Sequence, residues 1–214
     1  MEINSFVGGY DKNLSYLIWC TSSKRAALID PSTEINEIIE YVELHDLILE
    51  KVLITHTHFD HIQFLNDILF YFPNLQICGH VNPEKQIKGN YKGLNHYEIL
   101  SIGMDIITIL HTPGHYPDSI CFWDKQNNFL FTGDTMFVGR TGRTIDKKSN
   151  ISKLYNSIYR IILKLPSNTQ IFPGHHYGYK RNISLHENIS ISDFFNCKSE
   201  DEFKLVMDKY EKNR

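Results

Sequence analysis

Segment 55–61, with the sequence THTHFDH, constrains this chain more than any other feature. It directly follows a short apolar run, 51–55, that predicts a buried strand. It contains three histidines and one aspartate, and imidazole nitrogens and carboxylate oxygens suit Zn²⁺, Mn²⁺ or Fe²⁺. Because alternate residues of an extended segment point the same way, His56 and His58 can bind one ion together. The segment predicts a metal site at the end of a strand; the alternative is a solvated histidine-rich loop.

Three later turns each present one further side chain of the ligand type. The motifs TPGH, TGDT and FPGH end predicted strands and carry His115, Asp134 and His175. Asp60 and His61 lie where the first segment turns into a predicted helix, so they can face the same space from another side. Strand-end turns that each present a histidine or an aspartate are hard to explain by core packing alone. They strengthen the prediction of a metal centre.

The composition is that of an ordinary soluble globular protein. The 214 residues are 42% hydrophobic and 22% charged, and the formal net charge of -3 argues against a general nucleic-acid interface. The longest apolar runs are far short of the roughly 20 residues that a membrane span needs. The N-terminal sequence lacks the pattern of a signal peptide, and the four cysteines form no CxxC pair. We expect a cytoplasmic protein with no membrane partner.

Short strands alternate with helical segments along the chain. The predicted strands are 14–20, 26–29, 51–55, 75–78, 105–111, 119–123, 128–132 and 170–172. The predicted helices are 35–47, 62–72, 151–163 and 200–210. Ser32 and Thr33 are candidates for the N-cap of the first helix. This order predicts sheets covered by helices on the outside, in a single domain 1–214 with a short helical tail at about 199–212.

The order of these motifs, HxHxDH, TPGH, GDT and PGH, resembles the metallo-β-lactamase superfamily from about Leu14 to Tyr177. The resemblance implies an α/β (α+β) fold, the αββα sandwich, in which two mixed β-sheets are flanked by helices. It places metal ions at one edge of the sheets. It also implies two sets of ligands. The first ion would be held by His56, His58 and His115, the second by Asp60, His61 and His175, and Asp134 would bridge the two.

Two carboxylates have further expected roles. Asp60 is the candidate catalytic residue, because a carboxylate beside the ions can hold or accept the proton of the attacking water. Asp30 ends the predicted strand 26–29 and matches a family aspartate that orients a ligand histidine from the second shell. The alternative for Asp30 is a turn residue beside Pro31.

Segment 137–144, FVGRTGRT, resembles the glycine-rich loop of the glyoxalase II and persulfide dioxygenase branch. In that branch, a basic residue at the position of Arg143 and a tyrosine at the position of Tyr177 contact glutathione. The alternative for Arg143 is a salt-bridge residue of the protein itself. This sequence departs from the branch at Arg140, Thr141 and His176. Its short tail also lacks the helical domain that completes the glutathione site in glyoxalase II.

The function that the resemblance implies is a glyoxalase II-like thioesterase. Two divalent metal ions, with Zn most expected and Fe or Mn also chemically suitable, would supply a bridging hydroxide. The hydroxide would attack a thioester of glutathione or of another thiol. We expect a small-molecule substrate and a monomer or homodimer.

Two alternatives remain open. A mononuclear Fe(II) persulfide dioxygenase would use His56, His115 and Asp134, the two-histidine and one-carboxylate set of non-haem iron oxygenases. An inactive metal-binding module would keep the ligands without catalysis. Serine-nucleophile and P-loop mechanisms have no support, because the chain contains neither GxSxG nor GxxxxGK[ST].

Overall fold

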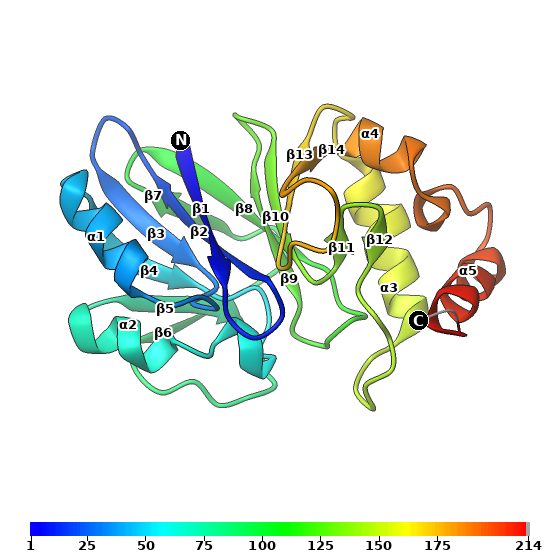
Figure 1. Cartoon of the computed structure of the whole chain (residues 1–214), viewed down its shortest axis with the longest axis horizontal. Coiled ribbons are helices and arrows are strands. Elements are labelled where there is room, and N and C mark those ends of the chain that lie inside the picture. The colour runs from blue at the N-terminus through cyan, green and yellow to red at the C-terminus, as the bar shows by residue number, and fades with distance from the viewer. Residues whose placement is uncertain (213–214) are drawn as a thin grey trace.

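Two six-stranded sheets lie face to face in the computed structural model, which describes residues 1–212 (Figure 1). The first sheet has the strand order of the sequence: β1 (Glu2–Gly8), β2 (Asn13–Trp19), β3 (Arg25–Ile29), β4 (Ile48–Leu53), β5 (Gln76–His80) and β6 (Tyr91–Leu94). The second has the order β14 (Ile183–Ser184), β13 (Gln170–Pro173), β10 (Phe129–Gly133), β9 (Ile120–Asp124), β8 (Asp105–His111) and β7 (Ile99–Ile102). Both sheets mix parallel and antiparallel pairs. A small hairpin, β11 (Met136–Phe137) and β12 (Arg140–Thr141), lies beside the second sheet.

Helices cover the outer face of each sheet, at the two sides of the molecule in Figure 1. The outer face of the first sheet packs against α1 (Asn36–Leu44) and α2 (Leu65–Tyr71). The outer face of the second packs against α3 (Ile151–Asn156), α4 (Leu185–Ser190) and α5 (Glu200–Lys212). The four layers are therefore helix, sheet, sheet and helix, and the expected αββα sandwich is confirmed.

Alternation of side chains along each strand produces these layers. In β2, Tyr16 and Ile18 point into the core between the sheets, whereas Leu17 points toward α1 and α2. In β10, Phe131 points between the sheets and Leu130 toward α3. Full burial of each such side chain stabilises the fold by about 1.5–3 kcal/mol. A strand with apolar residues on both faces therefore has to lie inside the sandwich.

The start of the first helix was predicted wrongly. Helix α1 begins at Asn36, with Ile35 at the N-cap and no side-chain cap. The hydroxyls of Ser32 and Thr33 are buried instead and lie 3.0 and 3.1 Å from Ser15 Oγ on β2. They attach the loop between β3 and α1 to the first sheet, a role that a search for helix caps cannot detect.

The predicted helix 151–163 is less regular than expected. Asn150 caps α3 by accepting a hydrogen bond from the backbone N–H of Lys153. The chain then continues through a π-helical segment, Ser157–Ile161, and a 3₁₀ turn, Ile162–Lys164. Ser157 Oγ donates a hydrogen bond to the carbonyl oxygen of Pro113, 2.7 Å away, in the turn before His115. The helix thus supports a turn of the candidate site.

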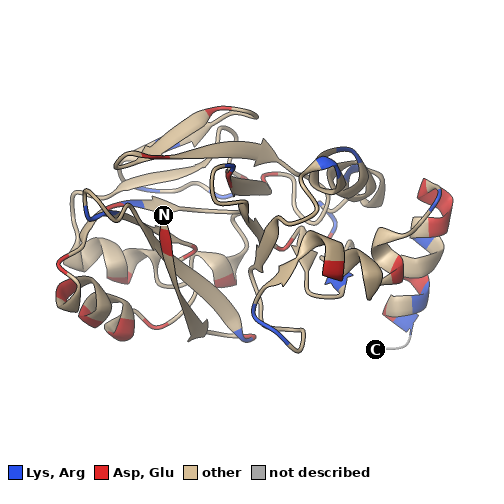
Figure 2. Cartoon of the chain, turned by 90° about the horizontal axis from the view of Figure 1, so that it is seen from above, with Lys and Arg blue, Asp and Glu red and all other residues tan. Residues whose placement is uncertain are grey.

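The tail forms a charged helix on the surface. Acidic residues occupy the first turn of α5 and basic residues its last turn (Figure 2). These charges interact favourably with the helix dipole and stabilise the helix. Its apolar residues Phe203 and Met207 are buried against the second sheet's helices. Within residues 1–212, no helix combines the length and apolar character needed to cross a membrane.

Candidate metal centre

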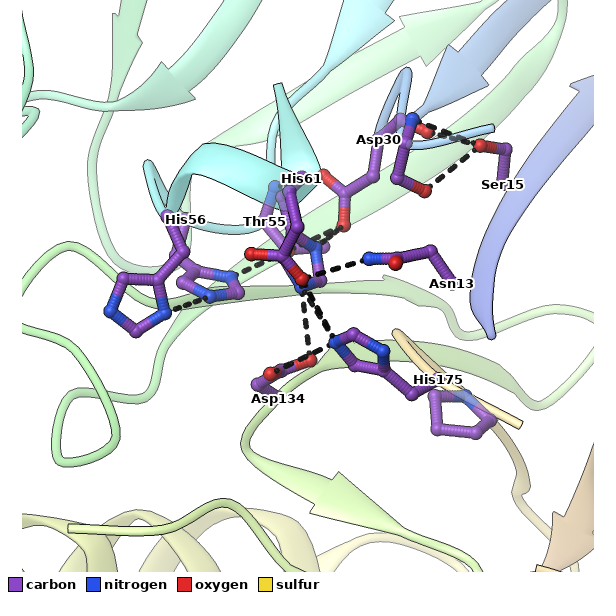
Figure 3. Close-up of polar contacts among 12 residues, drawn as sticks. Asn13, Ser15, Asp30, Thr55, His56, His61, Asp134 and His175 are labelled. Atoms are coloured by element: carbon purple, nitrogen blue, oxygen red, sulfur yellow. Dashed lines mark hydrogen bonds and ion pairs between the residues drawn. The ribbon is translucent and has the colours of Figure 1, made fainter. Parts of the chain in front are cut away.

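The ends of several strands meet at one edge of the sandwich, where loops bring the seven predicted ligand side chains together. The loop after β4 carries four of them, and the loops after β8, β10 and β13 carry one each. Three groups have potential ligand atoms within 4.8 Å of one another: His56, His58 and His115; His56, His61 and Asp134; and Asp60, His61 and His175. The close-up in Figure 3 shows side chains from these distant segments converging.

Three histidines, His56, His58 and His115, form what we call the imidazole half of the centre. His58 Nδ1 lies 2.9 Å from His56 Nε2 and 3.0 Å from His115 Nε2. Burial lowers the pKa of His56 well below its usual value, and burial together with His115 lowers the pKa of His58 to about 4. Both rings are neutral at pH 7, so their inward nitrogens carry lone pairs that a cation can use.

Asp60, His61 and His175 form the carboxylate half. His175 Nε2 lies 3.3 Å from His61 Nε2 and 3.3 Å from Asp60 Oδ2. Burial opposes protonation of both histidines, but the Asp134 carboxylate outweighs it. The pKa of His61 is raised well above its usual value, and that of His175 to about 10. In the absence of a cation, this half holds protons at neutral pH.

Asp134 contacts both halves. Its Oδ2 lies 3.5 Å from His115 Nε2 and 3.4 Å from His175 Nε2, and its Oδ1 lies 3.2 Å from His61 Nε2. Burial would raise the pKa of Asp134, but His175 and His61 hold it well below the usual value. Oδ1 is buried, and no residue of the described chain makes a hydrogen bond of good geometry to it. A cation between the halves would satisfy this oxygen.

The chain comes very close to Asp134 at Gly174. A Cβ atom at this position would lie 2.5 Å from Asp134 Oδ1 and 2.6 Å from His61 Cε1. Any side chain there would push two of the candidate ligands apart. The glycine of the FPGH motif is therefore needed for the close approach.

Hydrogen bonds on the outer side of the rings fix their orientation. His61 Nδ1 lies 2.8 Å from Asp30 Oδ2, and Asp30 also accepts hydrogen bonds from the backbone N–H and hydroxyl of Thr55 (Figure 3). The Nδ1 atoms of His115 and His175 lie 2.9 Å from the carbonyl oxygens of Arg143 and Asp11. When the outer nitrogen donates to an oxygen, the inner Nε2 is left as the acceptor that a metal needs.

Two supporting residues were not identified from the sequence. Asn13 Nδ2 donates a 2.9 Å hydrogen bond to Asp60 Oδ2, and the Asn13 side chain is fully buried. Asp118 accepts from the hydroxyl of Thr57 at 2.6 Å and from the backbone N–H of Glu84 at 2.9 Å, which holds the first loop in place. The only available signal for each was a polar residue at the end of an apolar strand. For Asp118, that position is also three residues after His115.

A small cavity of about 140 Å³ opens onto the centre. Its lining includes the two predicted substrate residues, Arg143 and Tyr177, and each already has a partner within the protein. Arg143 Nε and a terminal nitrogen donate to the carboxylate of Glu211 at 2.9 and 2.6 Å. The Tyr177 hydroxyl donates to Asp11 Oδ2 at 2.6 Å.

Comparison with known proteins relates this geometry to a family. The family described as "Metallo-beta-lactamase superfamily" matches residues 8–180. A hydroxyacylglutathione hydrolase of Dictyostelium discoideum is 33% identical over 176 residues, which cover 78% of this chain and 63% of that protein. The Bacillus velezensis protein named "Probable polyketide biosynthesis zinc-dependent hydrolase BaeB" is 28% identical over 193 residues, which cover 89% of this chain and 85% of that protein.

Among solved structures, ETHE1 from Myxococcus xanthus matches with a TM-score of 0.88 and 29% identity. The match covers 98% of this chain and 91% of that one. The chain thus matches less than two thirds of the length of the Dictyostelium hydrolase but nearly all of the Myxococcus protein.

Proposed function

The chain belongs to the metallo-β-lactamase superfamily, and from that premise we propose that it is a metal-dependent hydrolase of glyoxalase II type, which cleaves a thioester of glutathione or of another thiol. The observation that carries the proposal is the set of seven converging ligands with Asp134 between two halves. The hydroxyacylglutathione hydrolase among its relatives supports the choice of a thioester. The proposal takes 1–214 as one domain with a helical tail at 199–212, acting in the cytoplasm as a monomer or homodimer.

The residues fit two divalent cations. His58 Nδ1 faces the Nε2 atoms of both His56 and His115 but has at most one proton, so mutual hydrogen bonding cannot satisfy all three nitrogens. Asp134 Oδ1 is also buried without a good donor in the described chain. The imidazole half would hold one ion and the carboxylate half the other, with Asp134 shared. Histidine and carboxylate donors suit zinc, and iron or manganese are also chemically acceptable.

The protein's own groups would position the reactants. Bound ions would supply a water with a pKa lowered to roughly 7 and would polarise the thioester carbonyl. The Asp60 carboxylate is held by Asn13 and is ionised, since His175 and His61 outweigh the effect of burial and keep its pKa low. As a carboxylate it can therefore accept a hydrogen bond from the attacking water and orient it. The thiolate leaves without an acid, because thiols ionise readily.

Aromatic side chains restrict water on one side of the cavity. The ring of Tyr177 is stacked on that of His175, with centroids 4.7 Å apart. Phe137 packs edge-on against Tyr177 at 5.1 Å. This wall would cover the thioester while it reacts.

The second candidate is an Fe(II) persulfide dioxygenase that uses His56, His115 and Asp134. The observation that favours it is the nearly full-length match to ETHE1, which belongs to that branch. Both candidates keep all seven ligands, so their presence does not separate them.

Metal content and two assays test the proposal. We expect protein purified without oxygen to contain about two divalent ions per chain and to hydrolyse S-lactoylglutathione. A content of one iron per chain, with oxygen uptake on glutathione persulfide and no thioester cleavage, would establish the dioxygenase instead. Activity on neither substrate after reloading with zinc, iron or manganese would leave an inactive binding module.

A further inference from the structure

The cavity over the metal centre is too small for a complete thioester substrate. Its volume is about 140 Å³, whereas sites for ligands of ordinary metabolite size have roughly 300–1,000 Å³. The cavity can hold the reacting acyl group and the sulfur. The rest of the thiol must then lie outside it.

A larger groove adjoins this cavity. It has a volume of about 420 Å³ and is lined by Gly139, by Asp193 and Phe194 of a 3₁₀ turn and by one side of α5, including Val206. Arg140 and Tyr210 line both the groove and the cavity. A terminal nitrogen of Arg140 donates a 2.7 Å hydrogen bond to the Tyr210 hydroxyl at this boundary. The cavity and the groove therefore meet at this pair of side chains. A linear ligand could extend from the metal centre past this pair into the groove.

The two arginines beside the centre differ in charge compensation. Arg143 forms a double hydrogen bond with the Glu211 carboxylate, so its charge is neutralised within the protein. Arg140 instead lies over the ring of Tyr177, 4.2 Å from the centroid, and donates to the neutral Tyr210 hydroxyl. Within residues 1–212, no carboxylate lies within 4.0 Å of the Arg140 guanidinium. The uncompensated positive charge thus lies at the boundary of the groove.

We infer that this groove binds the thiol half of the substrate, with an anionic group of the thiol bound to Arg140. The Arg143–Glu211 pair acts as a positioning contact that holds α5 in place as one wall of the groove. The substrate class is a thioester of a linear thiol that carries a carboxylate or a phosphate. Its apolar part would lie against Ile191, Phe194 and Val206. This inference rests on the proposed function and deepens it.

Filling the groove gives the first test. Val206 lines it, whereas the neighbouring Leu205 is 69% exposed and lies outside it. We expect Val206→Trp to raise KM for S-lactoylglutathione at least about tenfold, with a much smaller change for the short neutral ester S-ethyl thiolactate. Leu205→Trp, the matched control, should change neither. Equal KM values for the two variants on S-lactoylglutathione would overturn the inference.

The arginines give the second test. Arg140→Gln removes a charge-assisted contact and should raise KM for S-lactoylglutathione about tenfold or more, with kcat changed less. Arg143→Gln and Glu211→Gln should have similar effects, and the double variant should be no worse than either. If Arg143 binds the substrate directly, Glu211→Gln will instead lower KM by freeing it, and the assignment of Arg140 will be wrong.

Direct binding separates this inference from the proposed function. Calorimetry on the metal-loaded protein with glutathione and with 4′-phosphopantetheine as probes does not require turnover. Either thiol should bind, and Val206→Trp but not Leu205→Trp should weaken this binding. That result would support the groove as a binding site even if no thioester is cleaved. The probe that binds more tightly shows whether Arg140 prefers a carboxylate or a phosphate. Binding of neither thiol, or binding insensitive to Val206→Trp, would refute it.

Discussion

The two halves of the metal centre use similar side chains but differ in protonation. In the imidazole half, burial lowers the pKa of His56 well below its usual value and that of His58 to about 4, so both rings are neutral. In the carboxylate half, Asp134 raises the pKa of His175 to about 10 and that of His61 well above normal. A cation entering the imidazole half finds free lone pairs, whereas one entering the carboxylate half has to displace protons. The number of nearby carboxylates, rather than the number of histidines, therefore distinguishes the two sites.

The halves also differ in how they are held. The loop of the imidazole half is fixed by Asp118 through Thr57. The carboxylate half depends on Asp30 at the end of β3 and on Asp11 and Asn13 in the β1–β2 connection. Asp30, Asp11 and Asn13 contact no ring of the imidazole half directly, so changes at these residues should affect the carboxylate half more.

Removing one ligand of the imidazole half should have the largest effect. We expect His58→Ala to reduce the metal content from about two ions to about one and to lower kcat for thioester hydrolysis at least about 100-fold, because both ions act on the reaction. Metal analysis and steady-state kinetics measure this. His80→Ala is the control, since His80 stacks on His111 away from the centre. Full thioesterase activity without His58 would contradict a two-ion mechanism.

Asp30→Asn should affect one half more than the other. The variant keeps the size of the side chain but weakens the contact to His61 Nδ1, and loss of such an outer contact typically lowers metal affinity about 10–100-fold. We expect this loss for the ion of the carboxylate half and a change of less than about twofold for the other. Competition with a chelator, followed for each ion in turn, measures both. Equal losses would show that the halves do not bind independently.

The pH dependence of loading should separate the halves without mutation. Histidines with raised pKa values hold at least one proton at pH 7, and each displaced proton makes affinity rise about tenfold per pH unit. We expect this increase in affinity from pH 6 to 8 for the ion of the carboxylate half. The ion of the imidazole half should change little, because His58 is already neutral far above its pKa of about 4. Calorimetry in buffers of different ionisation enthalpy counts the protons, and none released by either ion would refute the assignment.

Asn13→Ala should have the smallest effect. It removes one hydrogen bond to Asp60, which typically contributes about 0.5–1.5 kcal/mol, so kcat or the affinity of the second ion should fall about 2–10-fold. Asn13→Asp is the sharper variant, because it places a second carboxylate against Asp60 and should weaken hydrolysis further. Thermal melting of both variants checks that the fold persists. An alanine variant with unchanged affinity and kcat would remove Asn13 from the support of the carboxylate half.

The convergence of the seven candidate ligands could be predicted because each lies in a recognisable short motif at the end of a strand. Asn13, Asp118 and Glu211 could not, since their contacts join positions 47, 61 and 68 residues apart. Such pairs have no local pattern. Their partners are known only once the sheets have packed.

The same physical limit applies to the fold. Strands with apolar residues on both faces, such as β8 and β10, were predicted well because burial imposes a strong pattern. Strand β1 was missed because most of its residues are only half-buried, and β6 because it has four residues with one buried. The six-residue helix α4 is too short for a helical period to be evident.

The contact between Asp11 and His175 also bears on the order in which the protein is completed. It joins positions 164 residues apart, and the backbone N–H of Leu14 reaches the carbonyl oxygen of Gly174 in the same region. During synthesis, His56 and His58 emerge early, whereas the last histidine arrives only when most of the chain has been made. A ribosome-bound or truncated chain that ends before residue 175 therefore has the imidazole half but cannot close the other. Under the proposed two-ion arrangement, binding of an ion in the carboxylate half would therefore report that the β1–β2 connection has met the end of β13.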